Sequence, residues 1–341
     1  MTGSAARATV VTLTPAPVLD RTYFVEGLVP GGVNRSVGVG EELAGKGINV
    51  SRALQLADVD APGIVPIGNS DPSVLERTGS KFITPVWVDG TLRVSTTIID
   101  SQGTTTRVTE SPRPISQRDW EHVIDLTERT VKETGAKWLV IAGAHPQIKE
   151  TGQELDLAEL FDRMDKLGVR VALDTSGNAL SVWARSGRAA IIKPNAEELA
   201  SAVGRTLRTI GDVIDAAQEL CRHGIEAVLA SLGADGIIAV TAEGMIGART
   251  APVKVINTVG AGDATLAGFL SAVATSPLPA GEKVLGVGFD VVKGVATAVR
   301  WGALKVQQQT SGLDTIDNLP ESFLNESPDR DKLLDEPAEA H

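Results

Sequence analysis

The strongest signal in this chain is the stretch Asn257-Thr258-Val259-Gly260-Ala261-Gly262-Asp263-Ala264-Thr265-Leu266-Ala267-Gly268-Phe269. A Gly-x-Gly turn that leads into a helix of small residues directs backbone N–H groups and the positive end of the helix toward one point. Such a point can hold a phosphate or a developing oxyanion. Asp263 would lie at the start of this helix, where a carboxylate can take a proton from an alcohol that attacks a phosphoryl group.

Two common nucleotide-binding motifs are excluded. The third glycine of a G-x-G-x-x-G fingerprint would fall at Thr265, and the chain contains no G-x-x-x-x-G-K-[ST] loop. Taken alone, a Gly-rich turn of this kind could also serve only to cap a helix. The whole string favours the phosphate site.

The middle of the chain alternates short β-branched runs with helical stretches, which predicts βαβ units and a mostly parallel sheet. One helix is expected at residues 116–134, where Ser116 can cap the first turn. Two segments, at about 20–39 and 82–110, do not follow this strand–helix alternation and predict a small β appendage. The expected strands are Trp138–Ala142, Arg170–Asp174, 189–193 and Ala227–Ser231.

Composition excludes several classes of protein. The 341 residues include 32 Lys and Arg against 43 Asp and Glu, a net charge of −11, so neither nucleic acid nor a membrane is expected as a partner. The single cysteine, Cys221, excludes an internal disulfide, and no signal peptide is recognisable. We expect a cytoplasmic protein with a folded domain at 1–317 and an acidic, disordered tail at 318–341.

A second cluster of glycines lies in Ala44-Gly45-Lys46-Gly47-Ile48-Asn49-Val50-Ser51-Arg52-Ala53-Leu54. Gly45 and Gly47 let the backbone approach an anionic or hydroxylated ligand, and Lys46 supplies a point charge between them. Asn49 offers a donor and an acceptor one turn into a helix. By itself, the segment could equally be a tight turn with a solvated lysine.

Together these motifs resemble the ribokinase-like (PfkB) carbohydrate kinases, and within them the 1-phosphofructokinase and tagatose-6-phosphate kinase branch. The resemblance covers about residues 8–317. It rests on NTVGAGDATLAGF, AGKGINVSRAL, Ile192-Lys193-Pro194-Asn195-Ala196-Glu197-Glu198, Ser231-Leu232-Gly233-Ala234-Asp235-Gly236, the Thr12-Leu13-Thr14-Pro15 opening and Val33-Asn34-Arg35, in the family's order.

The resemblance implies a three-layer α/β/α sandwich with a mostly parallel central sheet and a small β-sheet lid that closes over the sugar and forms a homodimer. It implies ATP and Mg²⁺ as cofactors. By the family motifs, the catalytic base is Asp263, and the anion hole is formed by Gly260, Ala261 and Gly262. The nucleotide is expected to contact Lys193, Asn195, Glu198, Ser231, Gly233 and Gly236, with Asn195 and Glu198 organising Mg²⁺ through water. The sugar is expected to contact Asp20, Gly45, Lys46, Asn49 and Arg93. Asn195 and Glu198 could also simply cap a helix, and both roles can coexist.

Departures from the family pattern all fall on the predicted sugar side. Thr14 replaces an asparagine, and the lid strand at 92–97, the turn at 109–114 and the loop at 143–146 differ from the usual segments. In that last loop His145 is a candidate substrate contact, because an imidazole can donate to a sugar hydroxyl or phosphate. The alternative is an exposed loop histidine.

The expected reaction is phosphorylation of fructose 1-phosphate to fructose 1,6-bisphosphate. Tagatose 6-phosphate or fructose 6-phosphate could be the acceptor instead, as could an unphosphorylated sugar or a nucleoside. A non-catalytic relative is disfavoured because it would not need Asp263. Arg35, Arg107 and Arg113 could add phosphate contacts from the lid or remain solvated surface charges.

Overall fold

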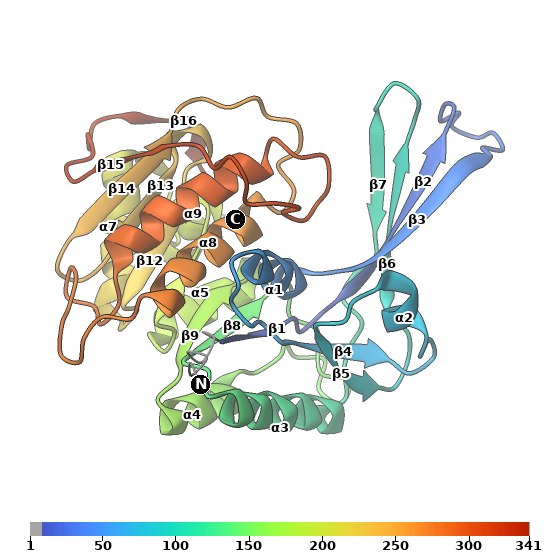
Figure 1. Cartoon of the computed structure of the whole chain (residues 1–341), viewed down its shortest axis with the longest axis horizontal. Helices are drawn as coiled ribbons and strands as arrows, with labels where there is room; N and C mark the ends of the chain where they lie inside the picture. Colours follow the sequence, from blue (N-terminus) through green and yellow to red (C-terminus); the bar gives the residue numbers. More distant parts are fainter. Residues whose placement is uncertain (1–8, 341) are drawn as a thin grey trace, which may run out of the picture.

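The structure, a computed structural model, describes residues 9–340 apart from the side chain of Glu336. A ten-stranded sheet runs through the body in the order β15-β14-β13-β12-β10-β9-β8-β1-β4-β5 (Figure 1). The strands from β5 to β12 are parallel, and β13, β14 and β15 are antiparallel. Their bounds are β1 Val10–Leu13, β4 Gly63–Gly68, β5 Ile83–Val88, β8 Trp138–Ala142, β9 Arg170–Asp174, β10 Ile191–Ile192, β12 Ala227–Ser231, β13 Ile237–Val240, β14 Met245–Thr250 and β15 Ser322–Asn325.

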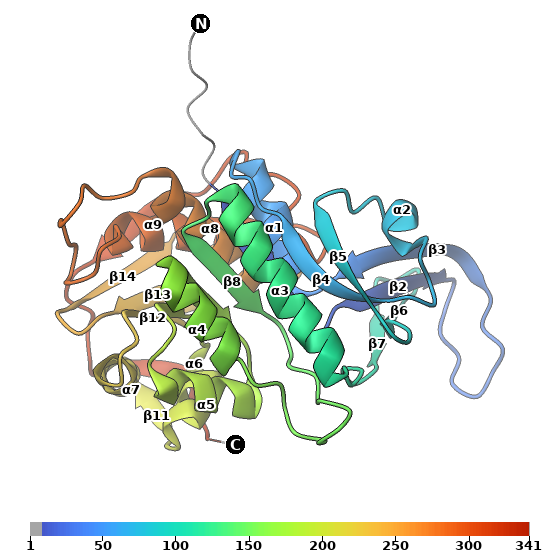
Figure 2. The ribbon, with the colours of Figure 1, turned by 90° about the horizontal axis from the view of Figure 1, so that it is seen from below.

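Helices cover both faces of this sheet (Figure 2), which confirms the three-layer sandwich. One face carries α3 (Gln117–Thr134), α4 (Ala158–Leu167), α5 (Gly177–Ser186), α6 (Ala196–Val203) and α7 (Ile210–Arg222), and the other carries α1 (Lys46–Leu56), α8 (Ala261–Thr275) and α9 (Val291–Lys305). As predicted, Ser116 caps α3 by accepting from the backbone N–H of Asp119. Within the described part of the chain, no helix combines the length and apolar character that crossing a membrane requires.

A separate four-stranded sheet, the lid, projects from the body (Figure 1). Its order is β3-β2-β6-β7, and its strands are β2 Val18–Val25, β3 Ser36–Ala44, β6 Arg93–Ile99 and β7 Thr105–Thr109. The prediction that 82–110 lies wholly outside the main layer is wrong, because β5 pairs with β4 in the large sheet. Ile83 and Val86 are buried there, so apolar burial keeps β5 in the body.

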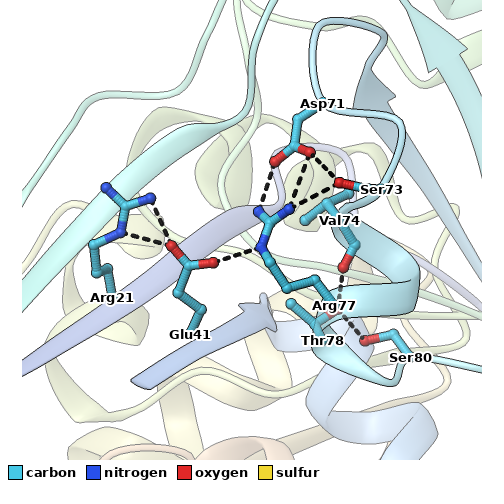
Figure 3. Close-up of polar contacts among 8 residues, drawn as sticks. All are labelled: Arg21, Glu41, Asp71, Ser73, Val74, Arg77, Thr78 and Ser80. Atoms are coloured by element: carbon cyan, nitrogen blue, oxygen red, sulfur yellow. Dashed lines mark hydrogen bonds and ion pairs between the residues drawn. The ribbon is translucent and has the colours of Figure 1, made fainter. Parts of the chain in front are cut away.

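An ion-pair network joins the lid to the short helix α2 (Val74–Thr78) between β4 and β5 (Figure 3). Glu41, on β3, accepts from Arg21 on β2 at 2.8 Å and from Arg77 of α2 at 2.7 Å. Arg77 also pairs with Asp71 at 2.7 Å. Because Arg77 bridges Glu41 of the lid and Asp71 of the body, the network links the base of the lid to the body.

The expectation of a disordered tail is also wrong. Residues 322–325 form β15 on the edge of β14, and β16 (Leu333–Ala338) pairs with β11 (Leu207–Thr209) in a two-stranded sheet. The pairing of β15 with β14 provides hydrogen-bond partners for backbone N–H and C=O groups along the edge of β14, which would otherwise be unpaired. The two basic residues of the tail pair with carboxylates distant in sequence, Arg330 with Asp215 at 2.7 Å and Lys332 with Asp235.

Candidate active site

A cleft of ≈ 490 Å³ lies between the lid and the carboxyl ends of the parallel strands. Asp174 ends β9, Lys193 follows β10 and Ser231 ends β12, so neighbouring strands deliver polar groups to one edge of the sheet. The predicted site residues that line this cleft are Asp20, Gly45, Lys46, Asn49, Arg93, Lys193, Asn195, Glu198, Ser231, Gly260, Gly262 and Asp263.

The turn before α8 has the close packing that its glycines permit. Gly260 is the N-cap of α8 with φ +80°, and a Cβ there would lie 1.9 Å from the backbone oxygen of Ser311. A Cβ on Gly262 would lie 2.9 Å from the ammonium of Lys193. The N–H groups at the start of a helix have no partner within it. The Ala261 N–H already donates to the Thr258 oxygen at 3.1 Å, so the turn can present the N–H groups of Gly260 and Gly262, together with Lys193, to an anion in the cleft.

Asp263 lies in the first turn of α8 and is only 6% exposed. The side-chain amide of Asn49, on α1, donates to Asp263 Oδ2 at 2.8 Å and orients the carboxylate. Burial, and secondly the charge of Asp174, raises the pKa of Asp263 to about 6. At neutral pH the group is therefore ionised with a pKa close to the working pH, which suits a general base.

Asp174 forms the floor of the cleft between two lysines. It is 1% exposed, and its carboxylate contacts Lys46 Nζ at 2.8 Å and Lys193 Nζ at 3.2 Å. Burial alone would raise the pKa of Asp174, but the charges of Lys193 and Lys46 outweigh burial and the pKa lies below its usual value. The two ammonium groups are thus held in place by a shared counter-charge.

The lid supplies the opposite wall. Asp20 pairs across strands with Ser95, and Ser95 with Thr109, which places Arg93 and Arg107 on the same face as Asp20. Arg107 contacts Asp20 at 3.1 Å. Arg93 donates to the backbone oxygens of Ala16 at 3.0 Å, Pro17 at 3.3 Å and Glu110 at 3.2 Å. The described part of the chain offers Arg93 no ion pair, so its charge can still serve an anion.

The profile of the pfkB family carbohydrate kinase matches residues 13–318. The chain belongs to the pfkB family of carbohydrate kinases. The kinase is 34% identical to a 1-phosphofructokinase of Haloferax volcanii, over 77% of this chain and 83% of that protein. It is 32% identical to the ATP-dependent 6-phosphofructokinase isozyme 2 of Escherichia coli, over 74% of this chain and 82% of that protein. The structure of phosphofructokinase-2 from Escherichia coli in complex with potassium superposes with a TM-score of 0.77 at 28% identity, covering 92% of this kinase and 96% of that chain.

The family implies ATP as the phosphoryl donor, and Asn195 and Glu198 are two residues that could hold a magnesium ion. The two residues form a capping box on α6: Asn195 Oδ1 accepts from the Glu198 N–H at 2.7 Å, and Glu198 Oε2 accepts from the Asn195 N–H at 2.9 Å. Both line the cleft, and the second oxygen of Glu198 is not used by the box. Oxygen donors of this kind fit an ion that keeps most of its water.

Four predicted site residues of the kinase do not line the cleft. Ala261 begins α8, and Gly233 and Gly236 lie in and after a short 3-10 turn beyond Ser231. His145 departs most from expectation. Gly143 and Ala144 reach the cleft from the same loop, whereas His145 is 9% exposed and neither of its ring nitrogens has a hydrogen-bond partner.

The buried His145 makes the stability of the kinase sensitive to acid. Burial lowers its pKa from 6.5 to about 4 against the opposing charge of Glu154, so the unfolded chain binds a proton that the folded chain excludes between these values. The contribution of His145 to the free energy of unfolding should therefore fall as pH drops from 6.5 toward 4, by up to about 1.4 kcal/mol per pH unit, whereas Asp263, with its pKa raised to about 6, contributes in the opposite direction. In urea titrations across this window, His145→Leu should lose that slope.

The matched control is His122→Leu, because His122 is exposed on α3. This variant should keep the pH dependence of the wild type. Equal slopes for wild type and His145→Leu would contradict the assignment of acid sensitivity to His145.

Two functional side chains of the kinase were missed or left open by the motifs. Asp174 belongs to none of them, and the available signal was an acidic residue at the carboxyl end of an expected strand. Arg107 could not be distinguished from a solvated surface charge. Its place in the cleft depends on the pairing of β6 with β7.

Proposed function

We propose that this kinase transfers the γ-phosphoryl group of ATP to fructose 1-phosphate and forms fructose 1,6-bisphosphate. The observation that carries the proposal is the position of Asp263, held by Asn49 at the start of α8 in a cleft that lid arginines enter from the other side. The relatedness to 1-phosphofructokinases from several bacteria and an archaeon supports this choice of acceptor.

In the proposed reaction, Asp263 accepts the proton of the acceptor hydroxyl, while the oxygen of that hydroxyl attacks the γ-phosphorus of ATP. The new P–O bond forms as the bond to the β–γ bridging oxygen breaks, and ADP leaves. Backbone N–H groups at Gly260–Gly262 and the ammonium of Lys193 balance the charge on the transferred group. Mg²⁺ bound through water near Asn195 and Glu198 would neutralise charge on the nucleotide phosphates.

The phosphate already on the sugar needs its own cations. Lys46 is committed to Asp174 at 2.8 Å on the floor of the cleft. Arg93 has no carboxylate partner among the described residues, and Arg107 has only the exposed pair with Asp20 at 3.1 Å. Because an arginine can bind phosphate through two parallel N–H groups, the lid arginines are the best candidates. The hydroxyl groups of the sugar would then contact Asp20, Gly45 and Asn49.

The second candidate acceptor is fructose 6-phosphate, which is favoured by the 32% identity to a 6-phosphofructokinase. Tagatose 6-phosphate, an unphosphorylated sugar and a nucleoside remain alternatives. ADP release measured over fructose 1-phosphate, fructose 6-phosphate, tagatose 6-phosphate, fructose and ribose tests them. The highest kcat/KM is expected with fructose 1-phosphate. A preference for fructose or ribose would contradict a phosphosugar site.

Arg107→Gln should raise KM for the phosphosugar by about tenfold, because one charge-assisted contact to phosphate is lost, with little change in KM for ATP. Arg21→Gln is the matched control, since Arg21 lies on β2 of the same sheet but on the opposite face from Arg107, where it pairs with Glu41. Equal effects of the two variants on KM for the phosphosugar would argue against phosphate binding by Arg107.

We also propose that the lid forms a homodimer. Val37, Val39 and Val108 lie on one face of the lid, opposite Asp20, and expose 70%, 55% and 66% of their surface. Apolar side chains gathered on one projecting sheet favour burial against another protein surface. A second copy of the lid would provide that surface. Sedimentation analysis should give the mass of two chains, and Val108→Glu should shift it toward one.

A further inference from the structure

Lys305, the last residue of α9, is a charged side chain with no exposed surface. Its ammonium donates to the backbone oxygen of Asn257 at 3.3 Å. Within residues 9–340 it forms no ion pair. Burial lowers the pKa of Lys305, and the more distant carboxylates of Asp314 and Asp263 only oppose that effect. A buried cation without a carboxylate partner destabilises a fold, so its presence needs a reason.

The ammonium lies behind the turn that precedes α8. A Cβ on Gly260 would be 3.5 Å from Lys305 Cε, and Asn257 begins the segment that leads into Gly260. Hydrogen bonds tie this segment to the chain that follows α9. The N–H groups of Ile256 and Asn257 donate to the oxygen of Val306 at 2.7 and 3.1 Å, and the Asn257 amide donates to the oxygen of Gln309 at 2.8 Å.

A lysine in the last turn of a helix often stabilises the negative end of the helix dipole. That effect is available to an exposed lysine and does not require burial. Lys293, in the first turn of the same helix, has the exposed side chain that is usual for a lysine. The position of Lys305 is instead explained if its counter-charge arrives with the substrate, on the other side of the Gly260–Gly262 turn.

We propose that Lys305 is a positioning residue that serves as a built-in cation for the anion hole. It holds the carbonyl of Asn257, which fixes the turn, and adds positive potential behind the N–H groups of Gly260–Gly262. That potential acts on the phosphoryl group most strongly when negative charge develops on it, in the transition state. The proposal rests on the role given above to this turn in phosphoryl transfer, and it does not depend on which sugar is the acceptor.

Two neutral variants separate charge from hydrogen bonding. Lys305→Met removes both, whereas Lys305→Gln keeps a donor for the Asn257 carbonyl. With the best acceptor of the wild type, both should lower kcat by about tenfold or more, and KM for ATP and for the sugar should change by less than about twofold. Thermal unfolding of Lys305→Met should occur at an unchanged or higher temperature, because burying the apolar methionine side chain avoids the desolvation penalty of an unpaired charge.

Lys293→Met is the control, with the same chemical change on an exposed face of the same helix, and it should leave kcat unchanged. A folded Lys305→Met with wild-type kcat would overturn the proposal. Wild-type kcat in Lys305→Gln would show that the charge is not needed, and failure of both variants to fold would assign Lys305 to folding alone. A wild type without turnover on any acceptor would instead refute the proposed function.

Discussion

Replacing Asp263 by Asn should reduce kcat by about 10³-fold or more, since general-base catalysis and the correct placement of a charge are lost together. The amide is nearly the same size as the carboxylate, so the fold and the cleft should be retained. ATP binding, measured by calorimetric titration, should change little, because the nucleotide-side groups Lys193 and Ser231 are untouched.

The pH profile provides a second test of the same group. Because the pKa of Asp263 is about 6 in the free enzyme, kcat/KM of the wild type should fall as pH is lowered through that value. Asp119→Asn is the control: Asp119 also lies in the first turn of a helix, α3, but outside the cleft. Substantial turnover by Asp263→Asn, with the wild-type acid limb, would rule out Asp263 as the base.

Replacing Asp174 by Asn should destabilise the fold by about 3–5 kcal/mol, because the substitution leaves the charges of Lys46 and Lys193 in the floor of the cleft without their shared partner. Urea unfolding measures this loss. Asp165→Asn is the matched control. It breaks the more exposed pair with Arg188 at 2.6 Å, and such pairs contribute about 1 kcal/mol or less.

Asp174→Asn should also move the acid limb of the kcat/KM profile to lower pH. The charge of Asp174 is the second cause of the raised pKa of Asp263, so its removal lets that pKa fall. Any active fraction of the variant is sufficient for this measurement. Wild-type stability together with an unmoved profile would show that the buried cluster does not have the role assigned to it.

Local sequence was sufficient where a feature depends on neighbours a few residues apart. The turn at Gly260–Gly262, the cap at Ser116 and the capping box of Asn195 and Glu198 each follow from side chains within one helical turn. The alternation of apolar runs was likewise enough for a mostly parallel sheet, whereas the helices on both faces were implied by the family resemblance. The same local reasoning failed for residues 322–325, whose acidic surroundings suggested disorder although β14 offers them an edge.

The amino-acid sequence by itself, through its motifs and their family resemblance, determined the fold class and the glycine turn that places Asp263 at the start of a helix, because these depend on residues close together along the chain. Only the tertiary structure decided that Asp174 joins Lys46 to Lys193, that His145 is buried and does not line the cleft, and that Lys305 lies behind Gly260. The physical reason is burial. The energy of a charge depends on the groups that surround it once water is removed, and those groups come from strand ends and helix ends far apart in sequence.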